Sequence, residues 1–140
     1  MAIIIDLKDA IRDKINAIDN KINFNFNEIE TVDYPYIFFY IPSYRIDKAL
    51  DPEYWRKLEL LCVLEYANSE DNNNNELWGY ADTLTQMITN ISFKGAYLNG
   101  RDPELKIIDD VLQLTFNLEL YVKVEELADL MLYLDFSYKN

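Results

Sequence analysis

The sequence predicts an α+β domain in which two helices pack on one face of an antiparallel sheet. Apolar residues occupy every second position from Leu112 to Val124, which is typical of a strand with one buried face. In two other stretches, apolar residues recur at three- and four-residue steps, as on one face of a helix. The order helix, strands, helix, strands favours an α+β domain over a parallel α/β fold.

The first helix is predicted over residues 6–20, with Asp6 as its N-cap and Asp9 at the third helical position. Its apolar face consists of Leu7, Ala10, Ile11, Ile15, Ile18 and Ile22. The asparagine-rich residues 23–27 are predicted to be a polar break, and 28–33 a short alternating strand.

Two longer strands are predicted next. Residues 34–41 are aromatic or β-branched and lie between two prolines, and both faces of this strand are expected to be covered. A turn at 51–53 leads to an alternating strand at 55–66. Its buried face consists of Leu58, Leu60, Cys62, Leu64 and Tyr66.

The polar residues 69–75 are predicted to form a mobile loop before the second helix. That helix is expected over 75–90, with Asn75 as its N-cap. A strand at 91–98, turns at 99–100 and 102–104, and a long strand at 105–124 with a bend at Asp109–Asp110 follow. The residues after 124 fit either a helix at 126–130 or a strand at 132–138.

Composition limits the classes of function. A chain of 140 residues is the size of one domain, so residues 1–140 are predicted to form a single unit. The net charge of −12 and the scattered basic residues argue against nucleic-acid binding. The chain lacks an apolar run long enough for a membrane span and lacks signal-peptide features, so the protein is expected to stay in the cytoplasm where it is made. Cys62, the single cysteine, is predicted to be a buried, inert thiol.

The sequence shows no arrangement of side chains that is typical of an active site. The chain has no histidine, and the neighbouring carboxylates Asp109–Asp110 and Glu125–Glu126 would point to opposite faces of a strand. A calcium loop at residues 71–82 is disfavoured because Glu76 occupies the position that needs glycine. We therefore predict no enzyme activity, no metal and no cofactor.

Aromatic residues are the most suggestive class, with 11 tyrosines, seven phenylalanines and two tryptophans. Such side chains offer rigid contact area and are enriched at protein interfaces, although core packing also accounts for them. They gather around the second predicted strand, at Tyr34, Tyr36, Tyr40, Tyr44 and Tyr54.

The whole chain resembles the tail terminator, or tail completion, proteins of tailed phages and phage-tail-like, bacteriocin-like particles, especially those of low-GC Gram-positive bacteria. The similar features are the amphipathic first helix, the strand 34–40, the unit from Arg56 to Tyr66, the variable polar loop, the helix that begins Leu77-Trp78-Gly79-Tyr80-Ala81-Asp82, and the closing strand 112–121.

The resemblance implies a structural subunit that forms a hexameric ring on the tail tube, ends tube polymerisation and offers a collar surface to the head connector. Its implied partners are other copies of itself, the tail tube protein, and a sheath or head-connector protein. Assembly is expected in the host bacterial cytoplasm, before incorporation into a virion or tail-like particle. The predicted ring contacts are Tyr36, Phe38, Tyr40 and Trp78, and the predicted partner-contact loop consists of Glu70, Asp71, Asn72, Asn73, Asn74 and Asn75.

Two alternatives remain open from the sequence. Another small head-tail joining or tail accessory protein would share the compact α+β layout. From a different class, an acidic antitoxin or inhibitor that masks a basic partner would share the size, the charge and the missing catalytic groups.

Overall fold

The computed structural model describes residues 2–27, 33–48, 55–71 and 73–123. The elements follow in the order α1 (Ala2–Ile18), β1 (Asn23–Phe26), β2 (Tyr36–Lys48), β3 (Trp55–Ala67), α2 (Asn74–Trp78), α3 (Ala81–Gln86), β4 (Ile91–Phe93), β5 (Ala96–Leu98), β6 (Arg101–Ile108) and β7 (Val111–Lys123).

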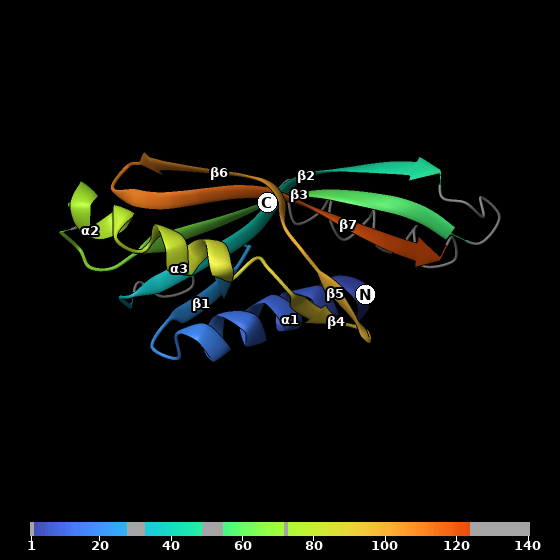
Figure 1. Cartoon of the computed structure of the whole chain (residues 1–140), viewed down its shortest axis with the longest axis horizontal. Coiled ribbons are helices and arrows are strands. Elements are labelled where there is room, and N and C mark those ends of the chain that lie inside the picture. The colour runs from blue at the N-terminus through green and yellow to red at the C-terminus, as the bar shows by residue number, and fades with distance from the viewer. Residues whose placement is uncertain (1, 28–32, 49–54, 72, 124–140) are drawn as a thin grey trace.

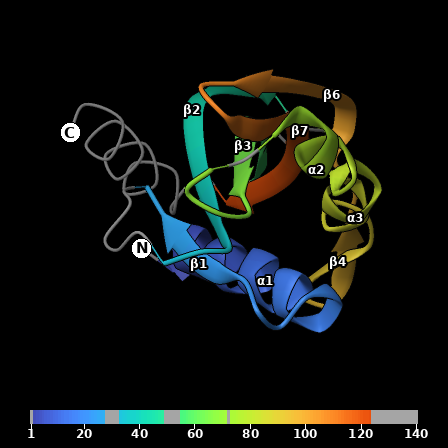
Figure 2. The same ribbon diagram turned by 90° about the vertical axis from the view of Figure 1, so that its left-hand side faces the viewer.

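The main sheet has the strand order β1-β2-β3-β7-β6, and β4 and β5 form a separate two-stranded sheet. Every pairing is antiparallel except β1 with β2, which is parallel. The predicted α+β class is confirmed, and the sheet is mixed instead of fully antiparallel. The sheet curves, and α1, α2, α3 and the β4–β5 hairpin cover its inner side (Figures 1 and 2).

The core lies between this inner side and the helices. Even-numbered residues of β7 from Leu112 to Val122 are buried, and they pair across with the even-numbered residues of β3 from Leu58 to Tyr66. The apolar stripe of α1 packs in the same cluster through Ile4, Leu7, Ile11 and Ile15. The alternation of β3 and β7 is therefore confirmed. Cys62 is fully buried as predicted, and burial raises the pKa of its thiol.

The N-terminal region differs from the prediction at two points. Helix α1 begins at Ala2 instead of Asp6, because Ile3 and Ile4 extend the apolar stripe into the core. The predicted polar break is strand β1. Its Phe26 ring stacks on Phe39 at 5.4 Å between ring centroids, so its apolar residues hold it against β2. Most of the strand predicted at 28–33 lies outside the described residues.

Strand β2 extends beyond the predicted end at Ile41 as far as Lys48. The register of β2 against β3 shifts between Tyr40 and Ser43. Pro42 lies in this irregularity, and it has no N–H group to donate in a hydrogen bond between strands. The turn predicted at 51–53 lies outside the described residues.

The second predicted helix is two short helices, α2 and α3, separated at Gly79–Tyr80. Asn73, not Asn75, is the N-cap of α2, because its side-chain oxygen accepts the Glu76 N–H at 2.8 Å. Between the helices, the Tyr80 ring stacks on Tyr66 at 3.8 Å, and its hydroxyl donates to Asp19 at 2.7 Å.

The two predicted C-terminal strands are hairpins instead. Lys94 and Gly95 have φ of 49° and 79°, and Asp109 and Asp110 have φ of 50° and 63°. Positive φ at both central residues is the geometry of a type I′ turn, which reverses a strand within two residues. The pairs β4–β5 and β6–β7 result.

Residues 99–100 connect β5 to β6, at the position where a turn is predicted. The turn predicted at 102–104 is wrong, because these residues lie inside β6, where the register is irregular and Asp102 has φ of 51°. The alternatives for residues after 124 lie outside the described residues.

Candidate functional site

Because the even-numbered residues of β3 and β7 fill the core, their odd-numbered residues project from the opposite, outer face of the sheet. We call this surface the outer face. It carries two groups of side chains: a row of aromatic rings along β2, and a network of ion pairs across four strands.

The aromatic row consists of Tyr34, Tyr36, Phe38 and Tyr40, at every second position of the chain. Ring centroids are 5.5 Å apart for Tyr34–Tyr36 and 4.9 Å apart for Phe38–Tyr40. The exposed fraction of the residue is 39% for Tyr34 and 8% for Tyr36, so the row is partly buried. Its exposed edges offer apolar contact area with hydroxyl groups at intervals.

Glu65 ties this row to the neighbouring strands. The Tyr40 hydroxyl donates to the Glu65 carboxylate at 2.8 Å, and the Gln113 amide donates to the same oxygen at 3.2 Å. Burial and then the Glu65 carboxylate raise the pKa of Tyr40 to about 12. The pKa of Tyr36 is raised by burial, then by the nearby Tyr34 and Glu65. Both hydroxyls are therefore neutral donors at physiological pH.

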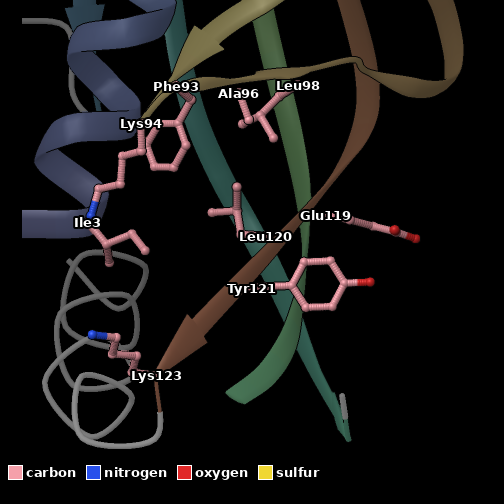
Figure 3. A pocket seen from close by; sticks show the side chains of 9 residues that line it. All are labelled: Ile3, Phe93, Lys94, Ala96, Leu98, Glu119, Leu120, Tyr121 and Lys123. Carbon is pink, nitrogen blue, oxygen red and sulfur yellow. The ribbon is translucent and has the colours of Figure 1, made fainter. Parts of the chain in front are cut away.

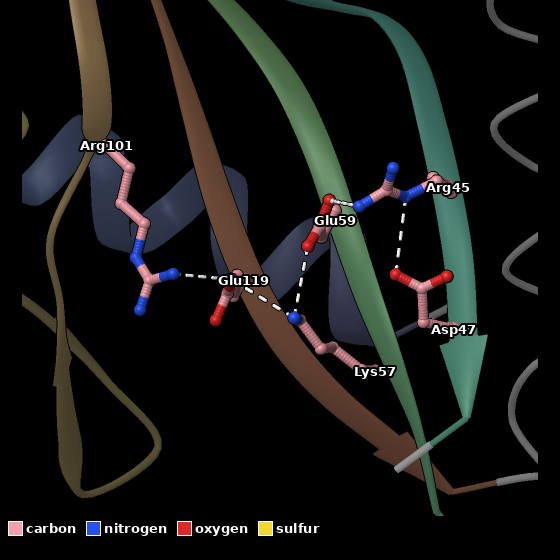
Figure 4. A network of polar contacts seen from close by, with 6 residues as sticks. All are labelled: Arg45, Asp47, Lys57, Glu59, Arg101 and Glu119. Carbon is pink, nitrogen blue, oxygen red and sulfur yellow. Dashed lines mark hydrogen bonds and ion pairs between the residues drawn. The ribbon is translucent and has the colours of Figure 1, made fainter.

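Along β2, the ion-pair network follows the aromatic row, starting at Arg45. Figure 4 shows the network. It joins β2, β3, β7 and β6 through Arg45, Asp47, Glu59, Lys57, Glu119 and Arg101. Lys57 bridges Glu59 at 3.1 Å and Glu119 at 3.3 Å. Hydrogen bonds to these two carboxylates raise the pKa of Lys57, and the hydrogen bond from Lys57 is the main cause that lowers the pKa of Glu59. Three cations and three anions balance within this network.

The structure brings together three of the four residues predicted for subunit contact. Tyr36, Phe38 and Tyr40 share the aromatic row, but Trp78 lies at the end of α2, whose Leu77 packs in the core on the inner side. Trp78 is 46% exposed, and among the described residues its ring contacts no other aromatic ring. A contact through Trp78 would therefore use a different part of the surface.

The predicted partner-contact loop is partly helical. Glu70 and Asp71 are exposed, Asn73 caps α2, and Asn74 and Asn75 form its first turn. Asn72 lies outside the described residues. The exposed positions remain available for contact, and their role stays a prediction.

Sequence reasoning missed the ion-pair network. The odd-numbered charged residues of the strands were a visible signal, but their meeting depends on the register of four strands and on the pairing of β3 with β7, which is distant in the sequence. Within the described residues, no group of three or more metal-ligating side chains comes together. No helix there is long and apolar enough to cross a membrane.

These features define a small α+β protein with a curved sheet, helices on one side, and a mixed aromatic and charged surface on the other. The family model described as "Phage tail terminator protein" matches residues 6–129. The chain belongs to the family of phage tail terminator proteins, and the predicted resemblance is confirmed. It is a structural protein of a phage-type tail.

Solved structures show the fold in other chains. One from the virion of a native gene transfer agent particle has 9% identity and a TM-score of 0.55, covering 88% of this chain and 98% of that chain. A second solved chain has 14% identity and a TM-score of 0.39 over 82% of this chain and 94% of that one, which is too loose to support an argument. No curated protein matches the chain.

Proposed function

We propose that this protein forms a hexameric ring on the end of a finished tail tube, stops tube polymerisation, and presents the collar surface on which the head connector assembles. The observation that supports this most strongly is the family match over residues 6–129. The same match favours a structural tail protein over the acidic antitoxin that the sequence left open.

In this proposal the ring contact is made by the aromatic row. Phe38 and Tyr40 lie half-buried in a sheet surface and point away from the core, so a second copy would cover area that water now wets. Trp78 and the exposed Glu70 and Asp71 serve separate contacts with the tube, the sheath or the connector. The net charge of −12 suits a ring through which DNA passes without binding.

The protein acts in this role without catalysis or a cofactor. It assembles in the host bacterial cytoplasm and ends in a virion or a tail-like particle. A low-GC Gram-positive source and a place among bacteriocin-like particles remain predictions of the sequence.

The proposal is tested by adding the purified protein to polymerising tail tube protein and measuring tube lengths by negative-stain microscopy. We expect shorter tubes, each with the protein at one end. Tubes that grow to their usual length, with no bound protein, would contradict the capping role.

The ring contact is tested with Phe38→Ser, which removes one ring of the aromatic row. The matched control is Tyr97→Ser, because Tyr97 is 70% exposed and belongs to β5, outside the main sheet. We expect Phe38→Ser to keep its fold by circular dichroism but to lose ring formation, and Tyr97→Ser to keep both. Normal ring formation by Phe38→Ser would place the contact elsewhere.

A further inference from the structure

Strand β7 has an open edge along its C-terminal part. β3 pairs with β7 over its whole length, up to Trp55 with Lys123. On the other side, β6 pairs only as far as Arg101 with Asn117. Within the described residues, the stretch of β7 from 118 to 123 therefore has a strand neighbour on one side alone.

The hairpin geometry shows which backbone groups face the open side. Ile108 and Val111 close a two-residue turn, so they form a hydrogen-bonded pair, and bonded positions then alternate along an antiparallel strand. The odd-numbered residues of β7 thus direct their N–H and C=O groups toward β6. Past Asn117, the same groups of Glu119 and Tyr121 point to the side where β6 has ended.

A pocket of about 570 Å³ lies beside this edge (Figure 3). The figure shows Leu120 directed into the space between β7 and the β4–β5 hairpin, with Phe93 and Leu98 on the hairpin side. Ile3 of α1 completes an apolar lining. The pocket therefore places apolar surface next to strand backbone that no strand of the described residues pairs on this side, which is the combination that binds an extended peptide.

The charges around the pocket favour an acidic partner. Lys94 and Lys123 line it, and the remaining charged residue of the lining, Glu119, is already paired with Lys57 and Arg101. Lys94 is itself 3.6 Å from Asp6, in an exposed pair that solvent weakens. The pocket lining thus holds two cations and one anion, in a chain of net charge −12.

We propose that the open edge of β7 accepts an extended segment of a partner protein, which adds a strand beside Glu119 and Tyr121. An apolar side chain of that segment fills the pocket, and an acidic side chain next to it faces Lys94. This site lies apart from the aromatic row and does not depend on ring formation.

The experiment measures binding of a fluorescently labelled, end-capped peptide of alternating glutamate and valine to the full-length protein, by anisotropy. An alternating lysine and valine peptide is the control probe. We expect the acidic peptide to bind and the basic one to bind at least about tenfold more weakly. Equal affinity for both, or no binding of either, would overturn the proposal.

Two matched pairs of variants locate the site. Tyr121→Pro removes the edge-facing N–H and leaves pairing with β3 intact, whereas Tyr121→Thr removes the ring and keeps the N–H. Lys94→Glu reverses a charge in the pocket, and Lys106→Glu makes the same change on exposed β6, outside the pocket lining. We expect about tenfold weaker binding for Tyr121→Pro and Lys94→Glu, with the two controls close to the unmodified protein.

Two results would contradict the proposed edge. Binding that Tyr121→Pro leaves unchanged would show that no strand is added there. Self-association that Tyr121→Pro abolishes, without any peptide binding, would assign the edge to a second copy of this chain instead of a partner peptide.

Discussion

At the residue scale, Glu65 is the group that holds the aromatic row to the sheet, through the Tyr40 hydroxyl and the Gln113 amide. Tyr40→Phe removes the hydroxyl with little change of shape. We expect a loss of about 1 kcal/mol in unfolding free energy near neutral pH, which is the usual net value of one hydrogen bond.

The contribution of Tyr40 to the unfolding free energy should also depend on pH. The pKa of Tyr40 is raised from 10.0 to about 12 in the folded protein, so its contribution is fully present below pH 10 and is lost as the pH rises through about 12. The stability difference between Tyr40→Phe and the unmodified protein should therefore shrink above pH 10. Urea unfolding across alkaline pH measures it, and a difference that stays constant would contradict the raised pKa of Tyr40.

Gly100 illustrates a requirement for space. A Cβ atom added there would lie 2.6 Å from Ile88 Cδ1 and 3.0 Å from Ile88 Cβ, and Gly100 also donates its N–H to the Ile88 carbonyl. We expect Gly100→Ala to cost about 1–3 kcal/mol by overpacking. In an Ile88→Val background, which lacks Cδ1, the cost should be smaller. Thermal unfolding of the four proteins measures this coupling, and additive effects would contradict the contact.

At the element scale, the cap of α2 decides where the polar segment becomes helix. Asn73→Ala removes the side-chain acceptor for the Glu76 N–H, and we expect a loss of about 1 kcal/mol. Asn75→Ala is the matched control, because Asn75 lies inside α2 and alanine is the better helix former. Chemical denaturation compares the two. Equal losses would show that Asn73 is not the cap.

The elements also show what a sequence pattern predicts and what it does not. The alternation in β3 and β7 and the stripe of α1 follow from burial, so periodicity identified them. The hairpin at Asp109–Asp110 was missed because two aspartates there adopt positive φ without a glycine to mark the turn. Strand β1 was missed because its asparagines made the segment appear polar, although its two phenylalanines pack against Phe39 of β2.

At the scale of the whole molecule, the sequence predicted the aromatic row but not the network beside it. Tyr36, Phe38 and Tyr40 lie on one strand, so their shared face follows from a period of two. The network depends on strand register, and its Lys57–Glu119 pair joins β3 to β7, which is distant in the chain, so no local pattern reveals it. Trp78 was grouped with the row by residue type alone, and the fold places it on a helix that packs on the inner side.

The architecture separates the surfaces that an assembly subunit needs. The inner side of the sheet is used for folding, since the core cluster fills it with α1, α2 and α3. The outer face, the end of α2 and the open edge of β7 are left for three different contacts. We infer that one chain of this size serves several neighbours in the particle through distinct elements.

The proposed ring is tested most directly by native mass spectrometry of the purified protein over a range of concentrations, alone and with tail tubes, followed by imaging of the largest species. We predict a closed hexamer with an open centre, formed by the unmodified protein and by Tyr97→Ser but not by Phe38→Ser. A protein that stays monomeric at every concentration, and that tail tubes do not capture, would contradict the account.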